Sequence, residues 1–329
     1  MAKEIELIRI KNAQSIPFQD IPVLQYSDFK SNMLALAEDK NTHCVNYFGF
    51  RQNSDFQLIA CMADDKTGDI AVLSHKIPVQ QHPVLESLAQ YYFPLHIFER
   101  EIHENCGIDF AGHPFQKPVR YPHERVDQNQ EINNYPFYTI ESEELHEVGV
   151  GPIHAGVIEP GHFRFICNGE TVLHLEIQLG WQHRGIEKLF LQKDKLLQRN
   201  LLAENIAGDT AIGHSLAFAQ LMESLGETTV SDQLHLERCI ALELERIAIN
   251  VGDISALCVD VAYNLGASVF SVLRTGIINF TQQWCGNRLG KGMIRTGGTN
   301  YRLTPELKTR VLEVLEDFEK RFVEMSHYT

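Results

Sequence analysis

The sequence predicts an α+β protein, in which an N-terminal α/β-sheet domain is followed by a small β element and a bundle of long helices. Two observations favour this class. β-rich runs separated by turn residues crowd the first part of the chain, and apolar residues recur at three- and four-residue spacing over most of the chain after Gly185. A length of 329 residues favours two domains over one.

The N-terminal domain is expected to alternate helix and strand. Ser27 is a candidate N-cap for a helix that runs to Glu38. Three β-rich runs follow, at residues 44–50, 55–63 and 69–77. The turn sequence at residues 64–68 separates the last two runs. Residues 84–104 are predicted to be helical, with a break near Pro94.

A stretch without periodicity divides the chain. Residues 121–138 hold two prolines and three asparagines, which favours a linker over residues 123–147. We therefore expect domains at residues 1–122 and 148–329.

Asn168-Gly169 lies between two β-rich runs, and this pair is typical of a hairpin with a type I′ turn.

Helices are expected over nearly all of the chain after Gly185. The first long one covers residues 212–224. One arc of it is expected to be buried: Leu216, Ala219 and Leu221. Residues 234–254 keep the same apolar spacing for several turns. Thr304-Pro305-Glu306 places an N-cap before proline at the first helical position, which predicts a final helix towards Met325.

The composition excludes two classes of partner or location. A formal net charge of −14 argues against nucleic acid, which requires a basic surface. The most apolar run, residues 254–280, is interrupted by Asp260, Asn264 and Arg274, so we expect one buried helix of a soluble protein there instead of a membrane span.

The seven cysteines are dispersed and form no CxxC pair, which predicts reduced core thiols and no iron–sulfur cluster held by this chain alone.

One segment of the second domain carries an altered metal motif. Arg184-Gly185-Ile186-Glu187 and the segment 205–214 together resemble the RGxE…RxCGxCxxxH signature of [NiFe]-hydrogenase large subunits. Ala207 and Thr210 stand where the signature has its cysteines. Neither side chain can replace a soft thiolate on nickel or iron, so NiFe binding is not expected.

Two further resemblances cover nearly the whole chain. Residues 98–101 (FERE) and 106–114 (CGIDFAGHP) resemble the C-type subunit of respiratory complex I. The second domain resembles the D-type subunit and, more closely, the large subunit of group 4 [NiFe] hydrogenases of the formate-hydrogenlyase type. The segments that carry this second resemblance are residues 150–154, 159–163, 183–188, 285–288 and 294–298.

The resemblance implies a chain held on the cytoplasmic face of the inner membrane by partner subunits. These partners would be a small iron–sulfur subunit of the complex I B-type, membrane subunits, and in one alternative a quinone. No cofactor is expected in this chain. Hydrogenase large subunits carry a second cysteine pair near their C-terminus, which would lie beyond Thr329, so the second domain is expected to be C-terminally incomplete.

Four side chains are candidate catalytic residues. Glu187 occupies the place of the proton-relaying glutamate, although a helix N-terminal acid explains it equally well. His214 fills the histidine of the metal motif or is a bonded core histidine. His154 and His162 flank the loop that reaches towards quinone in D-type subunits, or they bond nearby backbone. Asp209 is expected to cap the helix that begins near Ala211.

The resulting hypothesis is a subunit that assists electron transfer from an iron–sulfur partner without binding NiFe. Two alternatives remain: a redox-silent scaffold, and a quinone-reducing subunit. The tyrosine that partners the quinone histidine in the family is replaced here by Gly208.

Overall fold

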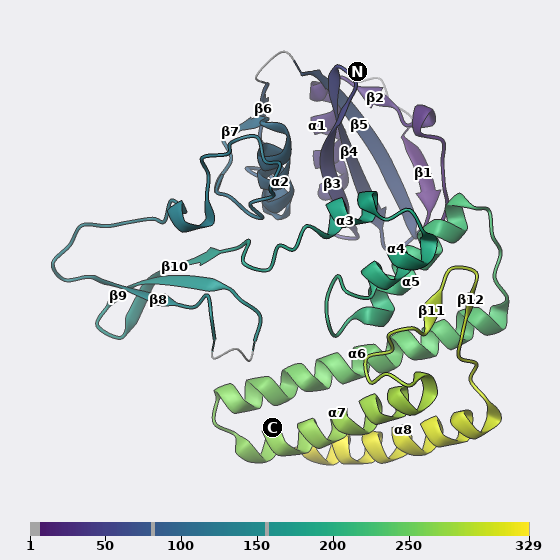
Figure 1. The fold of residues 1–329 in the computed structure, drawn as a ribbon. Helices are drawn as coiled ribbons and strands as arrows, with labels where there is room; N and C mark the ends of the chain where they lie inside the picture. The colour runs from purple at the N-terminus through teal and green to yellow at the C-terminus, as the bar shows by residue number, and fades with distance from the viewer. Residues whose placement is uncertain (1–6, 80–82, 155–157, 329) are drawn as a thin grey trace. The chain divides into compact units, whose positions relative to one another are not determined.

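The computed structural model describes residues 7–79, 83–154 and 158–328, and its helices and sheets confirm the α+β class (Figure 1). The chain forms two compact units, residues Met1–Gly185 and Ile186–Thr329. The first unit holds the sheets expected at the N-terminal end of the chain. The second is made almost entirely of helices, as the periodicity after Gly185 predicts.

A five-stranded sheet forms the centre of the first unit. Its strands are β1 (Ile8–Lys11), β2 (Val23–Leu24), β3 (Thr42–Gln52), β4 (Asp55–Asp64) and β5 (Asp69–Pro78). The order is β1-β5-β4-β3, with β2 parallel to β5. The three predicted runs are thus confirmed as β3, β4 and β5, and Gly68 has the positive φ (65°) that the turn between the last two requires.

Two helices pack on this sheet. Helix α1 (Tyr26–Ala37) contributes Phe29 and Met33, both fully buried, to a core shared with Leu58 of β4. Helix α2 (His96–Cys106) contributes Ile102 to the same core. Burial of these apolar side chains is the main stabilising contribution in this unit.

Two expectations for this unit are wrong. Ser27 is not the N-cap, because α1 already begins at Tyr26 and Gln25 occupies the N-cap position. The Tyr26 hydroxyl donates a hydrogen bond to the carbonyl of Glu86. Residues 84–104 are not one broken helix. Strand β6 (Val84–Glu86) pairs with β7 (Asp109–Ala111), and a 3₁₀ turn (η2, Phe93–Leu95) precedes α2. The pairing partner of β6 lies beyond any local window, so periodicity does not reveal it.

Helix α2 carries the FERE motif, and its charged residues fix the chain around it. Glu99 is fully buried, and it accepts hydrogen bonds from the Ser87 hydroxyl (2.5 Å) and the Leu88 N–H (2.7 Å). The guanidinium of Arg100 donates to two backbone carbonyls, those of Lys117 and Pro118. The motif is therefore a structural element in which buried charges are satisfied by backbone.

A separate three-stranded sheet follows the linker, with β8 (His146–Val150), β9 (His162–Asn168) and β10 (Thr171–Gln178) in the order β10-β9-β8. Asn168 pairs with Thr171, so the hairpin loop is Gly169-Glu170 instead of Asn168-Gly169. Of these two loop residues only Gly169 has positive φ (57°), whereas a type I′ turn requires it at both. The hairpin is confirmed and the predicted turn type is wrong.

This sheet belongs to the first compact unit, whereas the sequence places it at the start of the second domain. Glu176 of β10 forms an ion pair with Lys117 and accepts the Tyr138 N–H. Gln178 donates to the carbonyl of Ile132, which lies in the 3₁₀ turn η3 (Ile132–Asn134) of the linker. These long-range polar contacts attach β10 to the preceding segment, so the compact units divide after Gly185.

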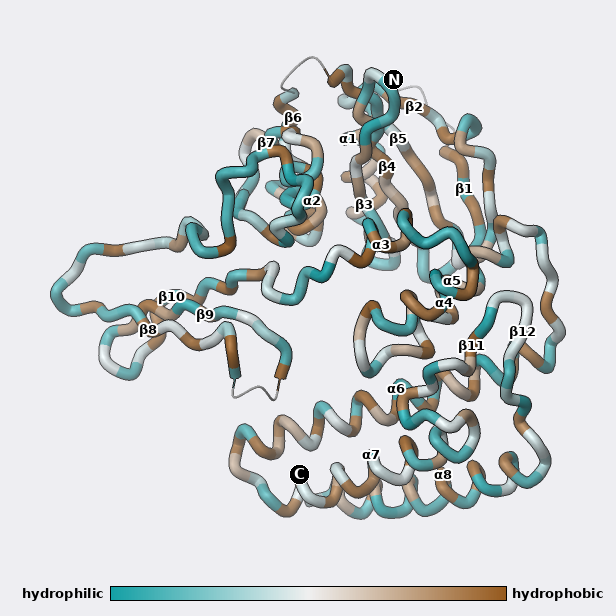
Figure 2. The backbone as a smooth tube through the Cα atoms, viewed as in Figure 1, coloured by the Kyte–Doolittle hydropathy of each residue, from teal (hydrophilic) through white to brown (hydrophobic). Residues whose placement is uncertain are grey.

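The second unit contains six helices within the part of the chain that the structure describes. They are α3 (Ile186–Gln192), α4 (Leu196–Ala203), α5 (Ala211–Leu225), α6 (Asp232–Asp260), α7 (Asn264–Cys285) and α8 (Pro305–Ser326). A short hairpin, β11 (Ile294–Arg295) with β12 (Gly298–Thr299), precedes α8. Hydrophobic and hydrophilic residues alternate along α6, α7 and α8, which pack through their apolar sides (Figure 2).

The predicted start of the last helix is confirmed, since the Thr304 hydroxyl accepts the N–H of Leu307 and Pro305 is the first helical residue. Residues 254–280, however, do not form one helix. Helix α6 ends at Asp260, Ala262 has a φ of 60°, and α7 begins at Asn264. None of the helices in the described ranges is long and apolar enough to cross a membrane.

The arc predicted for α5 is only partly buried. Leu216 is 8% exposed and Ala219 is fully buried, but Leu221 is 55% exposed. We expect Leu216→Ala to lower the free energy of unfolding by about 2–4 kcal/mol and Leu221→Ala by less than about 1 kcal/mol. Urea unfolding of the full chain, followed by far-UV circular dichroism, measures both. Equal losses would contradict the burial of Leu216.

Burial raises the pKa of Glu99 from 4.5 to about 7, against the lowering effect of its hydrogen bonds. Between these two pKa values the folded chain keeps a proton on Glu99, whereas the unfolded chain has already released it. We expect stability to fall as the pH rises from about 5 to 8, and Glu99→Gln to reduce this loss. Melting temperatures across this range measure it, with the exposed Glu38→Gln as control. A wild-type slope that Glu99→Gln leaves unchanged would refute the assignment.

Candidate functional site

The segment that resembles the metal motif joins α4 to α5 in the helical unit. Ala207 is half-buried, and Thr210 is the residue before α5, with its hydroxyl oxygen buried and without a hydrogen-bond partner in the described chain. Among the residues that the structure describes, no three histidine, cysteine, aspartate or glutamate side chains gather to hold a metal ion. A methyl group and a hydroxyl do not fit a NiFe centre, which requires soft thiolates.

A carboxylate from another helix satisfies the N-terminus of α5. Glu245 of α6 accepts the N–H groups of Ile212 (2.7 Å) and Gly213 (2.9 Å). These donors have no partner within their own helix, and the helix dipole favours a negative charge at this end. Asp209 is exposed and does not cap α5, so that expectation is wrong. Burial raises the pKa of Glu245, and the nearby charge of Asp209 raises it further.

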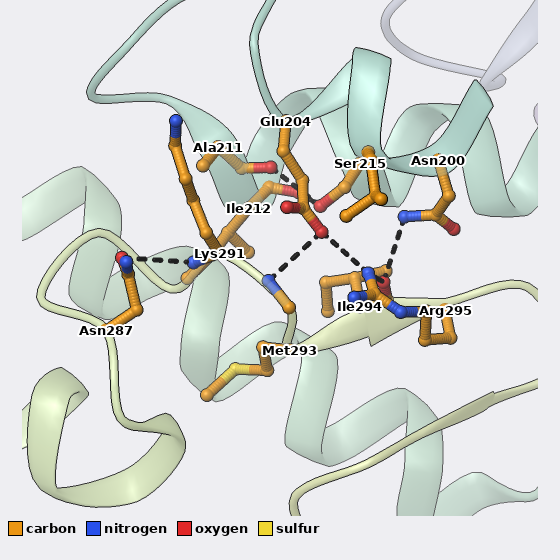
Figure 3. Close-up of polar contacts among 12 residues, drawn as sticks. Asn200, Glu204, Ala211, Ile212, Ser215, Asn287, Lys291, Met293, Ile294 and Arg295 are labelled. Atoms are coloured by element: carbon orange, nitrogen blue, oxygen red, sulfur yellow. Dashed lines mark hydrogen bonds and ion pairs between the residues drawn. The ribbon is translucent and has the colours of Figure 1, made fainter. Parts of the chain in front are cut away.

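A second carboxylate holds the segment before β11 (Figure 3). Glu204, at the end of α4, accepts the Gly292 N–H (3.0 Å) and a guanidinium N–H of Arg295 (2.6 Å). The Asn200 amide, one turn earlier, donates to the carbonyl of Ile294 (3.1 Å). Because Asn200 and Glu204 are almost completely buried, these bonds form away from competing water.

A third carboxylate forms a buried ion pair. Glu223 of α5 and Arg238 of α6 make two parallel hydrogen bonds, of 2.7 and 3.0 Å. Arg238 also donates to the carbonyl of Arg295, and Glu223 accepts the Gly297 N–H (2.6 Å). Burial raises the pKa of Glu223, but the bonds from Arg238 and Gly297 outweigh this effect and hold it below its usual range.

Of the four predicted catalytic residues, two lie in the helical unit. Glu187 is in the first turn of α3 and is exposed, so the buried carboxylate expected for a proton relay is not present there. His214 lies in the first turn of α5 and is half-buried. They belong to different helices.

The other two lie in the first unit, His154 in the segment after β8 and His162 at the start of β9, and each ring faces a backbone carbonyl. His154 Nε2 is 2.7 Å from the Gly161 oxygen, and His162 Nδ1 is 3.2 Å from the Gly151 oxygen. A carbonyl only accepts, so these ring nitrogens carry hydrogen. These bonds fix the orientation of both rings.

Sequence reasoning missed these three glutamates, of which Glu204 and Glu223 are buried and Glu245 is half-buried. Glu245 lies on the face of α6 formed by Ala241, Leu244 and Ala248, which are all buried. An acidic residue at an apolar position of the helical repeat was a signal for a buried carboxylate. Its hydrogen-bond partner, 33 residues away, had no signal in the sequence.

We expect Glu245→Gln to lower the free energy of unfolding by about 1–3 kcal/mol, because the amide leaves one N–H of α5 without an acceptor. The control is Glu243→Gln on the same helix, where an exposed pair with Arg246 is worth less than about 1 kcal/mol. Hydrogen exchange of the peptide that contains Ile212 and Gly213 provides a local readout. Unchanged exchange in Glu245→Gln would exclude the proposed cap.

The chain is similar in sequence to several known proteins. Residues 23–128 match the family of the respiratory-chain NADH dehydrogenase 30 Kd subunit. Hydrogenase-4 component G of Escherichia coli is 25% identical, with 67% of this chain and 42% of that protein covered. Formate hydrogenlyase subunit 5 of the same organism is 24% identical, with 65% and 41% covered.

A fused relative extends the similarity across both units. The C/D subunit of NADH-quinone oxidoreductase from Bacteroides thetaiotaomicron is 27% identical, with 76% of this chain and 53% of that protein covered. The chain thus spans about two fifths to one half of the length of these relatives. It carries a domain of the 30 Kd subunit family and is related to fused C/D subunits of NADH-quinone oxidoreductases and to hydrogenase subunits.

Proposed function

We propose that this chain is a subunit of a membrane-associated oxidoreductase complex of the complex I or energy-converting hydrogenase type. It holds its partner subunits in the arrangement that electron transfer requires, and it does not bind a NiFe centre itself. The supporting observation is the Glu245 carboxylate on the N-terminus of α5, beside positions where Ala207 and Thr210 replace the metal-binding thiolates.

The partners follow from the relatives and from chemistry. The electron donor is an iron–sulfur subunit, because this chain has no CxxC pair for a cluster of its own. Attachment to the membrane is peripheral and occurs through partner subunits on the cytoplasmic side. Quinone reduction is not favoured, because Gly208 stands where the family has the tyrosine that partners the quinone histidine.

The test uses the intact complex, purified from cells that express the full chain. We expect no stoichiometric nickel in this subunit and no viologen-linked hydrogen uptake that depends on it. Electron transfer by the complex should survive Glu187→Gln, His214→Gln and His162→Gln, each at about the wild-type rate. Complex assembly should be lost when the chain is deleted and restored by each of these variants.

The two parts of the proposal fail in different ways. Stoichiometric nickel with hydrogen turnover would overturn the absence of a NiFe centre. Loss of electron transfer in one variant, with assembly intact, would assign that side chain a direct role and overturn the scaffold function. Normal assembly of the complex without the chain would also overturn the scaffold function.

A further inference from the structure

The sheet formed by β8, β9 and β10 has an unusual distribution of side chains over its two faces. Residues paired directly across antiparallel strands point to the same face. The register gives two complete apolar rows on one face, Val148–Phe165–Leu175 and Val150–Phe163–Ile177. We call these six residues the outer face. The opposite, inner face carries the polar residues His162, Arg164, Glu176 and Gln178 together with the buried Ile166.

Two polar side chains of the inner face are buried and apolar side chains of the outer face are exposed, which is the reverse of what hydrophobic burial favours. On the inner face Glu176 is 3% exposed and Gln178 is 2% exposed, and both are bonded to the linker. On the outer face Leu175 is 47% and Ile177 is 43% exposed. Contiguous apolar surface of this kind is rare on monomeric proteins and marks an interaction site.

The charge around the outer face identifies the chemistry of its partner. Residues 141–179 contain seven acidic residues and one basic residue, Arg164, which is paired with Glu147. Five of the acidic residues are exposed and form no ion pair with a described residue: Glu141, Glu143, Glu144, Glu159 and Glu170. An acidic rim attracts a partner with basic residues around an apolar centre and repels one of like charge.

We infer that the outer face docks a partner protein subunit that presents an apolar patch rimmed by lysine and arginine. A second copy of this chain is disfavoured, since its own rim is acidic and its net charge is −14. An anionic membrane surface is disfavoured for the same electrostatic reason. The inference rests on the proposed function only in that the chain belongs to a multi-subunit complex.

The test replaces one residue of the outer face in the full chain. Leu175→Asp should reduce the fraction of the chain that co-purifies with the complex by about tenfold or more, because it places a charge within the apolar rows of the outer face. Thr171→Asp is the matched control, since it adds the same charge to the same exposed strand outside the apolar rows, and it should leave co-purification unchanged. Circular dichroism and melting temperature verify that both variants fold.

A photoreactive benzoylphenylalanine at position 175 identifies what covers the face. A cross-link to another subunit, at a peptide with apolar residues flanked by lysine or arginine, is the expected result. Glu143→Gln together with Glu144→Gln should then weaken the association at low salt and reduce its salt dependence.

Other results would overturn the inference. Cross-links between two copies of the chain, to residues 186–329 of the same chain, or to lipid would each assign the face to a different occupant. Full co-purification of Leu175→Asp would show that the face is not an interface. If the wild-type chain itself does not co-purify with an oxidoreductase complex, the proposed function fails instead.

Discussion

The arrangement of the helical unit depends on the need to satisfy buried carboxylates. A buried charge without hydrogen bonds costs several kcal/mol, so each such group fixes the donors around it. The buried Glu204 accepts the Gly292 N–H, and the buried Glu223 accepts the Gly297 N–H beside two bonds from Arg238. The half-buried Glu245 accepts two N–H groups at the start of α5. As a result, the segment between α7 and α8, which contains only two-residue strands, is held by the helices around it.

The need to satisfy polar groups also explains how α5 forms without metal-binding thiolates. The loop between α4 and α5 and the first turn of α5 keep the glycine and histidine of the metal motif, Gly208 and His214, but not its thiolates. The N-terminus of α5 instead meets a carboxylate from α6, which leaves the fold intact. Packing and hydrogen bonding in such a fold do not require a metal.

In the first unit, too, buried polar side chains fix the segments around them. Helix α2 directs Glu99 and Arg100 inwards, where backbone groups satisfy them. In the β8–β10 sheet Glu176 and Gln178 bond to the linker, while Leu175 and Ile177 on the other face are exposed. The polar contacts of Glu176 and Gln178 fix this orientation, so the chain presents hydrophobic surface where an isolated protein would hide it.

The sequence by itself determined the α+β class, strands β3 to β5, the hairpin position, the Thr304 cap and the loss of the thiolates at Ala207 and Thr210. These features are local, since they depend on periodicity, turn residues and ligand chemistry within a few positions. Only the tertiary structure decided the pairing of β6, the exposure of Leu221 and the partner of Glu245. Periodicity tells which face of an element is apolar. Which surface covers that face, and which donor satisfies a buried charge, depends on residues far away in the chain.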